Sequence, residues 1–144
     1  GKGYALDKLK STFQEWDIKN ILINSGRSTL LAMEPPKNEI GWPLIVSHLS
    51  HKSELKRIFL NKSAIAGSGV EKGDHIVSPS NYQPIQNRLG AWSMARTGAE
   101  EDALSTSFMI MSEGEILDYI KHHPDVGGMI FNEEGSLMKY GTLK

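Results

Sequence analysis

The sequence predicts an α+β fold in which helices pack on a mainly antiparallel sheet. The first observation is the order of the expected elements, which runs helix, several strands, two helices and a final pair of strands. The second is that short turns join neighbouring strands, as in β-hairpins. The third is the length of 144 residues, which suits one domain with a real hydrophobic core. We therefore expect residues 1–144 to form a single domain.

The first helix is expected at about residues 3–16. Apolar side chains recur there at the spacing of one helix face. This face comprises Ala5, Leu9, Thr12, Phe13 and Trp16. Charged and amide side chains fill the other positions, namely Asp7, Lys8, Lys10, Gln14 and Glu15. We expect the apolar face to be buried and the polar side chains to point outward.

Strands are expected where short apolar runs end at turn residues. They are residues 21–23, 29–33, 42–46, 55–60, 62–66, 88–96, 126–131 and 136–140. The first two strands form a hairpin, the fourth and fifth turn at Asn61, and the last two form a third hairpin. Before residue 88 lie a flexible glycine-rich loop (67–73), a short extended segment (74–77) and a long loop (78–87). In the sixth strand, alternation puts Ala91 and Ser93 on one face and Trp92 and Met94 on the other.

Two capped helices follow the sixth strand. Thr97 with Glu100, and Ser112 with Glu115, match the capping-box pattern. The first of these helices has one apolar face, which comprises Ala103, Leu104, Ser107, Phe108 and Met111. The second carries Ile116, Leu117, Tyr119 and Ile120 and ends before Pro124. We expect both apolar faces to lie on the sheet.

The composition excludes several classes of function. The net charge is -1 with no basic or acidic block, which gives no electrostatic basis for binding nucleic acid or a membrane surface. There are no cysteines, so disulfides, thiolate metal sites and cysteine catalysis are excluded. No apolar run approaches a transmembrane length, and no signal peptide is visible. The sequence begins at Gly1 without a Met, and we expect it to be part of a longer protein.

One polar pair stands out on the helix after Thr97. Asp102 and Thr106 are four residues apart, so their side chains stack on one face of the helix. A carboxylate above a hydroxyl is a place to hold a hard cation such as Mg²⁺. The alternative is a polar stripe that faces water, and the spacing alone favours this alternative.

Other segments also carry candidate chemistry. The loop at residues 67–73 lacks the P-loop and dinucleotide patterns, but its glycines allow backbone N–H groups to approach a phosphate; the alternative is a plain turn. His75 lies between two loops, where it is either a general acid/base or a structural residue. Lys2, Gly3 and Tyr4, at the start of the first helix, offer an anion site at a helix N-terminus or an ordinary cap.

Two histidine pairs are candidate metal ligands. His48 and His51 are three residues apart, and His122 and His123 end a predicted helix. A metal site needs a third ligand, and the sequence identifies none for either pair. The second pair suits a helix C-terminus on electrostatic grounds.

Six of these segments, in this order, resemble the ApbE family of FAD:protein FMN transferases, formerly called thiamine-biosynthesis lipoproteins. They are residues 2–7 (KGYALD; family KGYAxD), 23–26 (INSG; a strand and Gly-Gly-Asp/Asn turn), Trp42, 66–69 (AGSG; A-x-S-G-D), 75–79 (HIVSP; H-I-x-D-P) and 102–106 (DALST; D-A-L-A/S-T). The last segment is the family's most diagnostic one. The resemblance spans nearly the whole chain.

The resemblance implies a T-fold-like architecture and a flavin transferase that binds FAD and Mg²⁺. Such an enzyme transfers FMN to a Thr or Ser hydroxyl of a target protein and releases AMP. By this resemblance Asp102 and Thr106 bind the metal, with a backbone carbonyl near Lys2 as a further ligand, and His75 lies close to the reacting phosphate. The residues implied to line the nucleotide site are Lys2, Gly3, Tyr4, Asp7, Ser68 and Gly69.

The sequence departs from the family pattern at several acidic positions. Val70 and Ser78 replace two family aspartates, and residues 26–28 (GRS) replace the Gly-Gly-Asp/Asn turn. These departures motivate an alternative, a non-catalytic ApbE-like domain that binds flavin or nucleotide or interacts with a partner. The resemblance also implies that the chain is the C-terminal part of a longer one. Family analogy suggests the bacterial periplasm or the outer face of a membrane.

Overall fold

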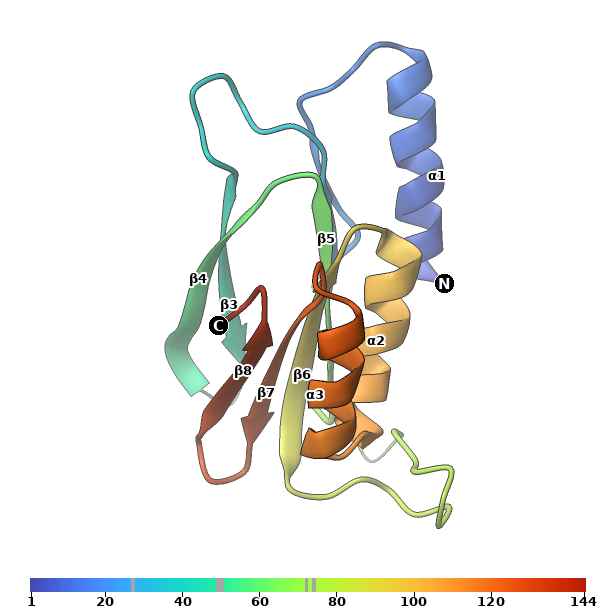
Figure 1. Cartoon of the computed structure of the whole chain (residues 1–144), viewed down its shortest axis with the longest axis vertical. Coiled ribbons are helices and arrows are strands. Elements are labelled where there is room, and N and C mark those ends of the chain that lie inside the picture. Colours follow the sequence, from blue (N-terminus) through green and yellow to red (C-terminus); the bar gives the residue numbers. More distant parts are fainter. Residues whose placement is uncertain (27, 49–50, 72, 74) are drawn as a thin grey trace.

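The computed structural model describes residues 1–26, 28–48, 51–71, 73 and 75–144, and only the backbone of residues 51–54. Three helices lie on one face of a six-stranded sheet, and a two-stranded sheet lies on the other face (Figure 1). The helices are α1 (Lys2–Glu15), α2 (Gly98–Ile110) and α3 (Glu113–His122). The strands are β1 (Leu22–Asn24), β2 (Thr29–Ala32), β3 (Trp42–His48), β4 (His51–Leu60), β5 (Ser63–Gly69), β6 (Arg88–Ala95), β7 (Gly127–Asn132) and β8 (Leu137–Gly141).

The main sheet has the order β1-β2-β5-β6-β7-β8, and every pair of neighbours is antiparallel. This confirms the predicted α+β class with a mainly antiparallel sheet. The predicted hairpins β1–β2 and β7–β8 are also confirmed. Along the chain, β3 and β4 come between β2 and β5, although β2 and β5 are neighbours in the main sheet. The helices α2 and α3 likewise come between the neighbouring strands β6 and β7.

The predicted hairpin about Asn61 is wrong, because β4 and β5 belong to different sheets. β4 pairs with β3, starting from Trp42 opposite Leu60, whereas β5 pairs with β2 and β6. At the crossing, the Asn61 amide donates to the Ile40 carbonyl at 3.1 Å, and the Lys62 N–H donates to the Met33 carbonyl at 3.2 Å. These two bonds direct the chain out of one sheet and into the other.

The expectation of a flexible loop at residues 67–69 is wrong as well, since β5 continues through Gly69. Gly67 lies directly against the indole of Trp92, its partner on β6, and a Cβ at Gly67 would lie 2.7 Å from that ring. The glycine therefore makes room for a large side chain within the sheet. Beyond β5, Lys72 and Asp74 lie outside the described residues, and Ile76 is buried.

The helix-facing side of the sheet carries a row of small residues. Thr29, Ala66, Ser93 and Gly128 lie side by side across β2, β5, β6 and β7. The Ser93 hydroxyl donates to the backbone carbonyl of Glu101 on α2 at 2.5 Å. The small side chains let α2 lie close to the sheet. The hydrogen bond from Ser93 fixes the position of α2 along β6.

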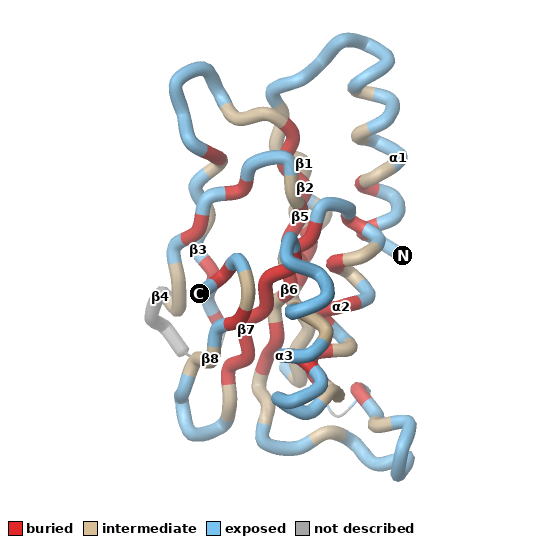
Figure 2. The backbone as a smooth tube through the Cα atoms, in the orientation of Figure 1, coloured by how far each residue is buried: buried red, intermediate tan, exposed pale blue. Residues whose placement is uncertain are grey.

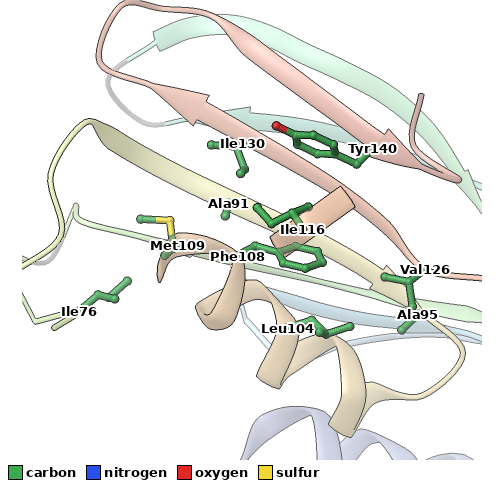
Figure 3. Close-up of a cluster of buried hydrophobic side chains, with 10 residues drawn as sticks. All are labelled: Ile76, Ala91, Ala95, Leu104, Phe108, Met109, Ile116, Val126, Ile130 and Tyr140. Atoms are coloured by element: carbon green, nitrogen blue, oxygen red, sulfur yellow. The ribbon is translucent and has the colours of Figure 1, made fainter. Parts of the chain in front are cut away.

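The largest cluster of buried hydrophobic side chains lies between α2, α3 and the sheet. Phe108 and Met109 of α2 pack with Ile116 of α3 and with Ala91 and Ile130 of the sheet (Figure 3). On the opposite face of the sheet, a second buried cluster includes Val46, Ile58, Leu60, Ile65 and Met129. The predicted alternation in β6 is thus confirmed, because Ala91 faces the helices and Trp92 faces the β3–β4 layer.

The predicted buried face of α1 is wrong by a rotation about the helix axis. Gly3 and Leu6 are buried, whereas Leu9 and Trp16 are 45% and 76% exposed. Figure 2 shows that most of α1 is exposed. The cause is the crossing of α1 over α2, where a Cβ at Gly3 would lie 1.7 Å from the Gly98 carbonyl oxygen. Only glycines permit such a close approach of two backbones.

Asp7 fixes this crossing. Its two carboxylate oxygens accept from the N–H groups of Gly98 and Ala99 at 2.7 and 2.8 Å. These N–H groups open α2 and have no partner within the helix, so a carboxylate satisfies them and favours the positive end of the helix. Thr97 accepts from the Glu100 N–H at 3.3 Å as predicted, and the Ser112–Glu115 capping box of α3 is complete.

The buried face of α2 differs from the prediction by about one residue. Leu104 and Phe108 are buried as expected, but Ala103 is exposed. The Gly3 crossing and the Ser93 bond turn Glu101 inward instead, where it is 0% exposed and neither carboxyl oxygen has a hydrogen-bond partner among the described residues. None of the described helices is both long and apolar enough to cross a membrane.

Burial makes Glu101 a neutral group. Burial, and then the charges of Asp102 and Asp7, raise the pKa of Glu101 to about 9, against a smaller opposite effect of Lys2. A carboxyl group with no partner in an apolar site is far less costly to bury as the acid than as the anion.

The raised pKa of Glu101 predicts a specific pH dependence of stability. Above the ordinary pKa of 4.5 and up to about 9, the unfolded chain releases a proton that the folded chain keeps. The free energy of unfolding should then fall as the pH rises, by up to about 1.4 kcal/mol per pH unit from this group. Glu101→Gln should remove this slope in urea unfolding between about pH 5.5 and 8. Glu134→Gln, at an exposed turn residue, is the control; equal slopes in the two variants would contradict the assignment.

The Asp7 cap predicts a loss of stability in Asp7→Ala. The variant leaves the Gly98 and Ala99 N–H groups without their carboxylate, so we expect a loss of roughly 1–2 kcal/mol in urea or thermal unfolding. Asp118→Ala removes an exposed helical carboxylate of α3 and should change stability by less than about 0.5 kcal/mol. Equal stability of the two variants would show that the cap contributes nothing.

Candidate functional site

A cavity of about 590 Å³ lies where the start of α1 meets α2 and the end of β5. Five separate parts of the chain contribute its walls: Lys2; Ser25, Gly26 and Ser28; His48; Gly67, Ser68, Gly69, Glu71, His75 and Ile76; and Thr106. Five of the predicted site residues are among them, namely Lys2, Ser68, Gly69, His75 and Thr106. The fold therefore gathers residues that are up to 104 positions apart in the sequence into one hollow.

The carboxylate of Asp102 is bound to the start of α1. Its Oδ2 accepts from the Gly3 N–H at 3.2 Å and from the Gly1 amino group at 3.0 Å. Burial alone would raise the pKa of Asp102, but these two hydrogen bonds and the charge of Lys2 hold the pKa below its ordinary value. Asp102 is thus an anion, and it lies one turn of α2 away from Thr106, which lines the cavity.

A chain of hydroxyl groups connects α2 to β5. Ser68 Oγ lies 2.9 Å from Ser105 Oγ and 3.0 Å from Thr106 Oγ1, and the Ser105 hydroxyl donates to the Asp102 carbonyl at 3.1 Å. Because the Ser105 proton points to that carbonyl, Ser68 donates to Ser105 and Thr106 donates to Ser68. Thr106 Oγ1, which belongs to the cavity wall, then still has lone pairs that can accept.

This donor set suits Mg²⁺ better than a transition metal. Asp102 and Thr106 offer a carboxylate and a hydroxyl, both hard oxygen ligands. Within the described residues no group of three His, Cys, Asp or Glu side chains could hold a metal ion. Mg²⁺ does not need such a cage, because it commonly takes one or two protein carboxylates together with waters and substrate phosphates.

His75 and Lys2 present their polar groups at the cavity. The exposed His75 ring has Nδ1 at 2.8 Å from the Gly73 carbonyl. A carbonyl only accepts, so Nδ1 carries the proton and Nε2 of the neutral ring is left to accept one. The Lys2 ammonium donates to Ser28 Oγ on the opposite wall.

Besides Asp102, three predicted residues lie outside the cavity wall. Gly3 is covered by the α1–α2 crossing, and both oxygens of Asp7 cap α2. The Tyr4 ring is 58% exposed and lies under the ammonium of Lys8, 5.3 Å away. These residues surround the α1 end of the site without lining the hollow.

His48 and Glu71 also line the cavity, although no sequence pattern predicts them there. His48 Nε2 lies 3.4 Å from Glu71 Oε1 and 3.3 Å from the Leu89 carbonyl, and the buried ring contacts Trp92 and Phe131. One signal for Glu71 was available in the sequence. Glu71 directly follows Val70, and the family pattern has an aspartate at the position of Val70.

The pair His122 and His123 does not form a metal site among the described residues. The prediction for His48 and His51 is not tested. The side chain of His51 lies outside the described residues. His122 and His123 hydrogen-bond through Nδ1 to the carbonyls of Asp118 and Tyr119, and His123 stacks on the Tyr119 ring at 4.0 Å. The second pair therefore serves the end of α3.

Solved structures of several ApbE proteins share this fold. The ApbE protein of Thermotoga maritima MSB8 superimposes with a TM-score of 0.84 at 22% identity, over 98% of this chain and 49% of its own. The flavin transferase ApbE of Vibrio cholerae gives a TM-score of 0.78 at 18% identity, over 98% and 48%. The apo flavinyl transferase ApbE of Pseudomonas stutzeri gives 0.72 at 17% identity, over 96% and 45%.

The chain spans about half the length of these solved structures. At such identities the likeness shows the fold. No curated protein sequence matches the chain closely enough to add to this comparison. The sequence model of the ApbE family, however, matches residues 1–130, and we conclude that the chain belongs to the ApbE family.

Proposed function

We propose that this chain carries the phosphate-side part of an FAD:protein FMN transferase, which moves FMN from FAD to a Thr or Ser hydroxyl of a target protein. The observation that carries the proposal is the cavity where Lys2, Ser68, His75 and Thr106 meet. These residues belong to four of the segments that resemble the family motifs. Family membership supports the same reaction class, as do the printed names of the Vibrio and Pseudomonas proteins as flavin or flavinyl transferases.

The diphosphate of FAD fits the start of α1. Lys2 supplies a cation at the cavity, and the first N–H groups of a helix favour an anion. Asp102 and Thr106 would hold Mg²⁺, which when bound neutralises the diphosphate and polarises the phosphorus under attack. The low pKa of Asp102 keeps this carboxylate ionised and available as a ligand.

His75 is the proposed proton acceptor. The acceptor hydroxyl oxygen attacks the phosphorus of the FMN half of FAD, a new P–O bond forms, and the P–O bond to AMP breaks. The hydroxyl proton passes to His75 Nε2, which is the unprotonated nitrogen when Nδ1 donates to the Gly73 carbonyl. AMP leaves with the bonding electrons of the broken P–O bond.

A second candidate function is a non-catalytic domain that binds flavin or nucleotide. The observation that favours it is the fate of the two positions where the family pattern has aspartates. Val70 packs against the buried cluster beside α2, and the Ser78 hydroxyl bonds to that of Ser80 at 2.8 Å. Neither position offers a carboxylate to the cavity.

The metal assignment predicts that Mg²⁺ strengthens FAD binding through Asp102. In calorimetric titrations of FAD, we expect Mg²⁺ to lower the Kd, and Asp102→Ala to remove at least roughly a tenfold effect. Asp118→Ala keeps the same change of residue away from the cavity and should behave as the unchanged chain. FAD binding that is absent, or indifferent to both Mg²⁺ and Asp102→Ala, would refute the assignment.

The role of His75 predicts a loss of transfer without a loss of binding. With FAD, Mg²⁺ and a protein that carries a flavinylation site, mass spectrometry should show one FMN attached to the acceptor. His75→Gln should slow this transfer by roughly 100-fold or more, while the FAD Kd changes little. His122→Gln is the matched control. Tight FAD binding with no transfer by the unchanged chain would instead support the non-catalytic alternative.

A further inference from the structure

A second cavity, of about 370 Å³, lies beside the C-terminal half of α1. Its walls are Lys10 and Gln14 of α1, Lys19 of the following loop, Met33 and Glu34 after β2, and Lys62 before β5. Its two residues from α1 lie in the half of that helix farthest from the N-terminus. At 1.5 Å per residue, Lys10 and Gln14 are about 12–18 Å along the helix from Lys2, so this cavity is separate from the candidate functional site.

The cavity is positively charged, although the whole chain has a net charge of -1. Three ammonium groups face one carboxylate in its wall. Lys62 pairs with Glu34 at 2.9 Å, and Lys19 pairs with Asp17, outside the wall, at 3.0 Å. Lys10 has no counter-ion in the part of the chain that the structure describes. The wall therefore carries an excess positive charge that can attract an anion.

The end of α1 does not oppose an anion here. The last carbonyl groups of a helix carry partial negative charge when they lack partners. In this chain the carbonyls of Thr12, Phe13 and Gln14 already accept from the N–H groups of residues 16–18. The Gln14 side chain adds an amide donor to the wall.

The cavity also has an apolar part. Met33 is only 5% exposed and forms part of the wall, and the aliphatic stems of the lysines flank it. The volume lies within the range of small-molecule sites. A fitting ligand therefore combines a compact anionic group with a small apolar body.

We propose that this cavity binds a small organic phosphomonoester. A phosphate dianion matches several lysines better than a single carboxylate does, because lysine binds phosphate as a point charge without demanding planar geometry. The phosphate lies among the three ammonium groups, and the organic body lies against Met33. This site does not depend on FMN transfer, since it shares no wall residue with the first cavity.

The test is a titration of the ¹⁵N-labelled chain with phenyl phosphate, followed by NMR. We expect amide shifts at Lys10, Gln14, Met33 and Lys62. Lys10→Gln should weaken binding by roughly fivefold, and Lys10→Gln with Lys62→Gln by more. Lys10→Arg keeps the charge and should retain binding, and Lys139→Gln controls for the loss of an exposed lysine elsewhere.

Several outcomes would overturn the proposal. They are no shifts up to ~10 mM phenyl phosphate, shifts confined to Lys2, Ser68 and Thr106, or equal affinity of the Lys10→Gln and Lys139→Gln variants. Two further titrations separate the parts of the ligand. Phenol that binds as well as phenyl phosphate refutes the anion requirement, and inorganic phosphate that binds as well refutes the role of the apolar wall.

Discussion

The crossing of α1 over α2 is the constraint on which the rest of the structure depends. Gly3 and Gly98 bring the two backbones into direct contact, and Asp7 holds them there through the first N–H groups of α2. Neither feature is local, because the partners are more than 90 positions apart. This one contact puts the start of α1, which carries Lys2, beside Asp102.

The sheet supplies the second part of the arrangement. The small residues Ala66 and Ser93 let α2 approach, and the hydroxyls of Ser68, Ser105 and Thr106 join the helix to β5 at the edge of the cavity. One side of α2 thus packs on the sheet, and its hydroxyl groups form the edge of the cavity. This double use explains why a serine-rich helix stays on the sheet although its buried face is only partly apolar.

The sequence could predict the features that local patterns determine. The fold class, the two hairpins and the helix caps follow from spacing and turn residues within a few positions. The buried faces of α1 and α2 could not be predicted in this way, because the Gly3–Gly98 crossing turns both helices. The pairing of β4 was predicted wrongly for a similar reason, since an apolar strand satisfies a pairing with β3 or with β5 equally well. The contact of His48, at the end of β3, with Glu71 also could not be predicted, because only the folded chain brings these two residues together.

The adjacent carboxyl groups Glu101 and Asp102 show how the same crossing separates two chemistries. Glu101 points into the core and has a pKa raised to about 9, whereas Asp102 accepts hydrogen bonds from α1 and has a lowered pKa. Two neighbouring anions would repel each other, so protonation of the first favours ionisation of the second. Near neutral pH this pair carries one negative charge, on the residue beside the cavity. A neutral Glu101 therefore supports the negative charge of Asp102 that the proposed Mg²⁺ site requires.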